Sequence, residues 1–107
     1  ERRGDRNEVN RLTNLKQQAN LQLGFAKQAE KDAKAAYDKA YADLLTLRNT
    51  IEAVSQEEYE IQGLGQKFKD QKALCYKLLN ESTDAYLAKS KAQDKVANIK
   101  FGASLFG

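Results

Sequence analysis

The chain has 107 residues, enough for one domain with a modest core. It contains no Pro and no His, which favours long helices and removes both the commonest metal ligand and the side chain most used for acid–base catalysis near neutral pH. Charged residues make up 31% and hydrophobic residues 41% of the chain, with a net charge of +3, which excludes disorder driven by low hydrophobicity.

The first residues, Glu1 to Asp5, resemble an N-terminus left by cleavage, because the chain contains no Met. The chain is then either a processed mature protein that has lost a targeting peptide or a trimmed piece of one. We expect the processed form, which favours an organelle lumen or a secretory compartment over the cytoplasm.

A heptad repeat covers the first half of the chain. With Val9 as position a, all d positions are apolar: Leu12, Ala19, Ala26, Ala33, Ala40, Leu47, Val54 and Ile61. A seven-residue repeat keeps one apolar seam on one side of a helix, so the pattern predicts coiled-coil-like packing. Alanine dominates the middle of the seam, where a partner helix can approach closely.

Gly24 interrupts this pattern, because a glycine inside a helix costs about 1 kcal/mol relative to Ala. We therefore predict two helices, over residues 5–23 and 25–62. The first helix carries Leu12 and Leu15 on an apolar stripe that needs a partner. It either folds back at Gly24 as a third helix of a bundle or projects beyond the hairpin.

The segment Gln62-Gly63-Leu64-Gly65 is the predicted bend. Gly63 suits the left-handed position that ends a helix, with Leu64 packing back on Tyr59. A return helix over residues 66–101 follows, and Ser82 and Lys89 interrupt its apolar heptad positions: Phe68, Cys75, Leu78, Ala85, Ala92, Val96 and Ile99. The pattern on both sides of the bend predicts an antiparallel hairpin.

Three further features bear on the fold. Residues 80–84 are polar enough to break the return helix, although a solvent-facing turn of one continuous helix is the favoured interpretation. Gly102 is a natural helix end, which leaves an apolar tail over residues 102–107. The acidic residues Glu52, Glu57, Glu58 and Glu60 precede the bend, and we expect them to pair with lysines of the return helix.

The predicted fold class is therefore all-α: a single domain, residues 1–107, built as a coiled-coil-like antiparallel helical hairpin within a small up-and-down bundle. The bundle has three helices, or four if residues 80–84 form a break.

The sequence shows no Gly-rich phosphate loop, no cysteine–histidine cluster and no nucleophile–histidine set. We predict no catalytic, cofactor or metal site and no enzymatic activity. Cys75 occupies a seam position, where a small apolar core residue is a better interpretation than a reactive thiol.

The predicted function is that of a non-enzymatic structural or accessory subunit, which docks into a larger assembly through helical packing. A specific version is an extrinsic subunit of an organellar photosynthetic or respiratory membrane complex, in peripheral contact with the membrane. The expected partners are other protein subunits or further copies of the chain, and the partner-binding residues are Leu12, Leu15, Phe101, Leu105 and Phe106.

The alternative is a nucleic-acid-binding arm that uses the lysine-rich return helix. Its lysines are spread around the helix with acidic residues among them, whereas phosphate recognition usually uses a stripe on one face. We therefore expect no nucleic acid as the partner.

Overall fold

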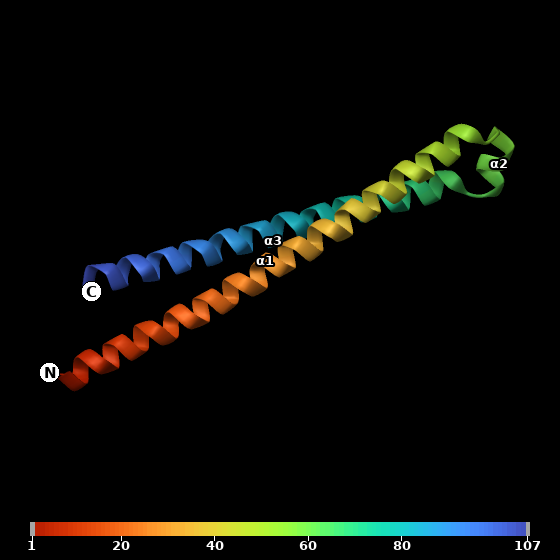
Figure 1. Ribbon diagram of the computed structural model, residues 1–107. Coiled ribbons are helices and arrows are strands. Elements are labelled where there is room, and N and C mark those ends of the chain that lie inside the picture. The colour runs from red at the N-terminus through yellow and green to blue at the C-terminus, as the bar shows by residue number, and fades with distance from the viewer. Residues whose placement is uncertain (1, 107) are drawn as a thin grey trace. The chain divides into compact units, whose positions relative to one another are not determined.

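The computed structural model describes the backbone of residues 2–106 and the side chains of residues 6–99. That part of the chain forms three helices and no strand: α1 (Arg2–Ala53), α2 (Gln56–Ile61) and α3 (Leu64–Phe106). α1 packs against α3 as an antiparallel hairpin, and α2 lies in the connection between them (Figure 1). The predicted all-α hairpin is confirmed.

The chain divides into two compact units, each of which pairs a stretch of α1 with a stretch of α3. The terminal unit comprises residues 1–30 and 85–107, and the bend unit comprises residues 31–84. We describe each unit separately.

The core of the bend unit is a single seam of side chains between α1 and α3. Its buried residues are Ala40, Leu64 and Cys75, at 5%, 2% and 7% exposure. Gln71 also lies at a seam position of α3, and its Nε2 donates a hydrogen bond to the backbone oxygen of Ala40 at 2.8 Å. The alanine leaves space for the longer polar side chain, so a polar layer is satisfied inside an otherwise apolar seam.

The seam of the terminal unit contains Ala19 and Val96, at 1% and 7% exposure. Around them lie half-buried apolar residues from both helices: Leu12, Leu15, Leu23, Ala26, Ala85, Ala92 and Ile99. The predicted a positions Val9 and Lys16 are exposed and do not join this seam. The apolar packing is therefore thin in this unit.

The predicted helix break at Gly24 is wrong, because α1 is one helix from Arg2 to Ala53. Gly24 lies on the exposed side of the helix, and a Cβ added there would meet nothing within 4 Å. A penalty of about 1 kcal/mol for one glycine is small beside the hydrogen bonds and seam contacts on either side. Hence α1 does not fold back, and the third helix of the structure is α2 instead.

α3 is likewise continuous through residues 80–84, as favoured from the sequence. The hydroxyl of Thr83 donates to the backbone oxygen of Leu79 at 3.0 Å, a bond that a helix accommodates. The predicted helix end at residue 101 is wrong, because α3 passes through Gly102 to Phe106. No proline follows Gly102 to stop the helix.

α1 ends at Ala53, before Ser55, a break that the heptad pattern does not predict. The Oγ of Ser55 accepts a hydrogen bond from the backbone N–H of Glu58 at 3.2 Å and so caps α2. Ser55 and Glu58 have the S-x-x-E spacing of a capping box, which is the signal that was overlooked.

The predicted turn at Gly63 is confirmed, with a φ of 61°. Its N–H donates to the backbone oxygen of Glu60 at 3.1 Å, one of the two bonds of a Schellman motif. Tyr59 packs against Gly65, since a Cβ at Gly65 would lie 2.5 Å from the Tyr59 hydroxyl oxygen. Leu64, which was expected against Tyr59, is buried at 2% exposure.

The expected ion pairs between the acidic residues 52–60 and α3 lysines do not form within the described side chains. Glu58 instead accepts from Gln62 at 2.8 Å, and Glu60 accepts from Gln56 at 3.2 Å. The break at Ser55 explains the difference for Glu57, Glu58 and Glu60, because it places them on the short helix α2 rather than on α1, which contains Glu52.

Candidate functional site

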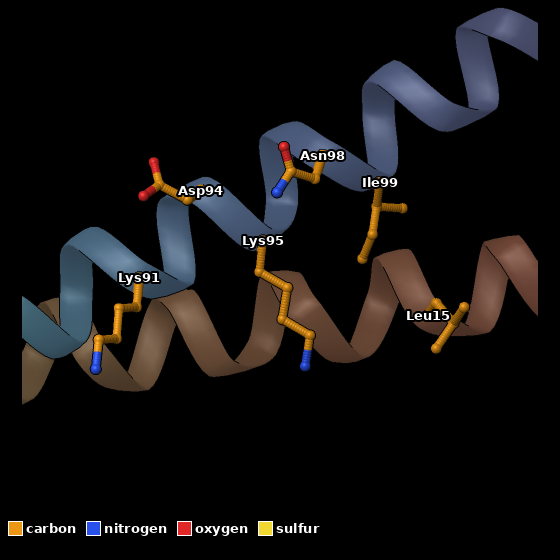
Figure 2. Close-up of a pocket in the computed structure, with 6 residues that line it drawn as sticks. All are labelled: Leu15, Lys91, Asp94, Lys95, Asn98 and Ile99. Atoms are coloured by element: carbon orange, nitrogen blue, oxygen red, sulfur yellow. The ribbon is translucent and has the colours of Figure 1, made fainter.

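An open groove lies between α1 and α3 in the terminal unit. Its volume is about 490 Å³, and six residues line it: Leu15 from α1, and Lys91, Asp94, Lys95, Asn98 and Ile99 from α3 (Figure 2). Leu15 and Ile99 are half-buried, so the groove has an apolar floor that the hairpin only partly covers.

The heptad pattern explains why the groove opens here. Lys16 occupies the a position where an apolar side chain would continue the seam, and it points into solvent. On α3, residues 91, 95 and 99 follow one another at intervals of four and therefore share one face of the helix. Two lysines and one isoleucine thus border a seam that α1 leaves unfilled.

The rim of the groove is polar and mainly basic. Figure 2 shows Lys91, Lys95 and Ile99 extending from α3 toward α1, whereas the carboxylate of Asp94 points away from α1. The Nζ of Lys95 donates a long hydrogen bond, 3.4 Å, to Oε1 of Gln22. This contact ties the two helices together at the edge of the groove.

Two large apolar side chains of the same unit lie on the surface of α1. Phe25 is 72% exposed and Leu21 is 62% exposed. Phe25 follows Gly24, where an added Cβ would meet no atom within 4 Å apart from its chain neighbours. Both residues lie outside the seam, so the hairpin itself does not use them.

Glu30 and Lys89 form a polar layer in the seam of the terminal unit. Their charged atoms lie 2.7 Å apart, and the two side chains are 25% and 23% exposed. Glu30 Oε2 is buried and makes no hydrogen bond of regular geometry with the described residues, so the nearby ammonium group is what balances its charge. Lys89 also lies 5.3 Å from the ring centre of Tyr86. Such a pair adds little net stability, because the cost of taking the charges out of water offsets much of their attraction.

A second ion pair joins Glu8 and Arg11 on the exposed surface of α1. Hydrogen bonding from Arg11 lowers the pKa of the Glu8 carboxyl, and the same bond raises the pKa of the guanidinium. Exposed pairs of this kind contribute little to stability, so this one has no role in the site.

The predicted partner-binding residues divide into two groups. Leu12 and Leu15 are half-buried in the terminal unit, and Leu15 lines the groove. Phe101, Leu105 and Phe106 belong to α3, but their side chains lie outside the described residues. Sequence reasoning did not single out Lys91, Lys95 and Ile99 together, although their spacing of four residues was a usable signal.

Within the described side chains, no group of acidic, histidine or cysteine residues has an arrangement that would hold a metal ion. None of the helices in that part of the chain is long and apolar enough to cross a lipid bilayer. Comparisons with known proteins find no matching family model, no matching curated protein and no matching solved structure.

Proposed function

We propose that the chain is a non-enzymatic structural subunit that docks into a larger assembly through the outer faces of its helices. The observation that carries this proposal is the apolar surface left outside the seam. Among the described residues five hydrophobic side chains are buried, whereas ten large ones are exposed, including Phe25, Ile61 and Tyr76 at 60% or more.

A more specific form of the proposal is an extrinsic subunit of an organellar photosynthetic or respiratory complex. The pI of about 9.0 suits docking on an acidic surface. Under this form, the exposed apolar side chains would contact neighbouring subunits, and the membrane contact would be peripheral.

The nucleic-acid alternative has less support from the structure. Of the α3 lysines, Lys89 is used in the seam against Glu30, and Lys95 contacts Gln22. A steep loss of binding with added salt would be the signature of phosphate recognition.

Crosslinking with mass spectrometry in the native source tests the proposal. We expect crosslinks from α1 and α3 to neighbouring protein chains. Replacing Tyr76→Ser and Leu79→Ser should reduce those formed near these positions severalfold, because both side chains are exposed apolar contacts. The matched control is Asn80→Ser, at a neighbouring exposed position on the same helix. A wild-type chain that forms no crosslink to any other chain would contradict the proposal.

A further inference from the structure

We propose that the ion pair between Glu30 and Lys89 selects the register in which α1 and α3 pair in the terminal unit. Without this pair, the seam would also accept pairings in which one helix is displaced by one heptad, about 10.5 Å along its axis. The inference concerns the alignment of the two helices and does not rest on the proposed docking function.

The apolar seam by itself distinguishes poorly between heptad registers. Four consecutive d positions of α1 are alanine: Ala19, Ala26, Ala33 and Ala40. The hydrogen bond between Gln22 and Lys95 places Val96 near the level of Ala19, and both of these residues are buried. Displacing α3 by one heptad would move Val96 to the level of Ala26, which exchanges one alanine for another. The small side chains therefore supply little that separates the two pairings.

The connection between the helices also leaves the register open. Ten residues, 54–63, lie between the end of α1 at Ala53 and the start of α3 at Leu64. Six of them form α2, which has no buried residue to hold it in place. An extended segment of ten residues spans roughly 33 Å, so the connection is long enough to follow a displacement of one heptad.

The polar contact in the seam of the bend unit does not identify one register either. Gln71 donates its hydrogen bond to the backbone oxygen of Ala40, and every residue of α1 has such an oxygen. After a displacement of one heptad, Ala33 would offer the same acceptor beside an equally small side chain. This bond therefore satisfies Gln71 without requiring one particular alanine.

Glu30 and Lys89 differ from these contacts, because their attraction requires both side chains. They occupy seam positions, they are half-buried, and their charged atoms lie 2.7 Å apart. A displacement of one heptad would bring Glu30 beside Val96 in one direction, and would bring Lys89 beside Leu23 in the other. Each charge would then lose its partner in a partly dehydrated seam, which is costly, whereas the intact pair adds little net stability. The pair therefore acts on the choice of register.

The groove depends on this choice. Leu15 of α1 and Ile99 of α3 form its floor. A displacement of one heptad would move Ile99 about 10.5 Å along α1, away from Leu15. The ion pair lies about four turns from Leu15 along α1, and it nevertheless determines which residues of the two helices meet at the groove.

Disulfide trapping in the full chain measures the register. All variants carry Cys75→Ala, and two new cysteines are placed at exposed positions of the terminal unit. Gln22→Cys with Lys95→Cys reports the observed register. Ala29→Cys with Lys95→Cys and Gln22→Cys with Ala88→Cys report displacements of one heptad in the two directions. Mass spectrometry quantifies the intramolecular disulfides at low chain concentration.

With Glu30 and Lys89 intact, the disulfide of the observed register should form almost alone. Glu30→Leu with Lys89→Leu should raise the share of the displaced disulfides by about tenfold or more, because the seam remains apolar but no longer distinguishes the registers. The helix content by circular dichroism should be unchanged. The exchanged pair, Glu30→Lys with Lys89→Glu, should restore the observed register.

Glu8→Leu with Arg11→Leu is the matched control. It removes an ion pair of the same charges from the exposed surface of α1 and should leave the disulfides unchanged.

Three results would overturn the inference. The first is a double-leucine variant whose displaced disulfides form no more than in the unchanged pair. The second is an exchanged pair that behaves like the double-leucine variant. The third is a loss of helix content in the double-leucine variant, because the ion pair would then be needed for folding itself.

Discussion

Gly24 lies in the middle of α1 and Gly63 lies between α2 and α3, and the backbone behaves differently at the two positions. Gly63 adopts a φ of 61°, in the left-handed region, and the chain turns there. Gly24 keeps a helical conformation, and α1 continues through it for 29 more residues to Ala53.

The surroundings account for the difference. Before Gly63, the capped helix α2 ends after one and a half turns, and Leu64 enters the core directly after the turn. Around Gly24, Leu23 and Ala26 remain in the seam on both sides of the glycine. Of these two glycines, the chain therefore turns only at the one where reversing its direction buries the next apolar residue.

The largest expected effect in this comparison is at the bend. Gly63→Ala should lower the free energy of unfolding by about 1–2 kcal/mol, because a left-handed conformation strains a residue with a Cβ. Urea denaturation at a fixed chain concentration measures it, with Lys67→Ala in the first turn of α3 as a control at an exposed position. A variant as stable as the wild type would show that the positive φ is not required.

A smaller effect of opposite sign is expected at Gly24. Gly24→Ala should raise the free energy of unfolding by up to about 1 kcal/mol, because alanine is the better helix former and its Cβ would meet no neighbour within 4 Å. The same denaturation experiment measures it. A loss of stability would indicate that α1 bends at this position.

The heptad pattern was sufficient to predict the hairpin, because the d positions from Leu12 to Val54 all lie at least half-buried in the seam. The pattern wrongly predicted burial at its two ends, where Val9 and Ile61 match the repeat but are 60% and 69% exposed. A repeat marks one face of a helix, and burial of that face also needs a partner helix beside it.

The polar seam residues were less predictable. Glu30 and Lys89 each interrupt the repeat of their own helix, and only the alignment of the two helices brings them within 2.7 Å. The groove depends on the same alignment, because Leu15 and Ile99 come from opposite ends of the sequence. The sequence identifies Phe25 as an apolar residue outside the seam, but its exposure follows only from the continuity of α1.

That continuity is the central claim, because a chain folded back at Gly24 would cover its own apolar stripe and would not form the groove between α1 and α3. The distance between two spin labels, measured by double electron–electron resonance, tests the continuity of α1 most directly. The labels are attached at Asn14→Cys and Ala29→Cys in a chain that carries Cys75→Ala. Both positions are exposed. A continuous α1 places their Cα atoms about 22 Å apart, from fifteen residues at the helical rise. A separation of about 12 Å, as expected of two helices packed side by side after a fold-back, would contradict the account.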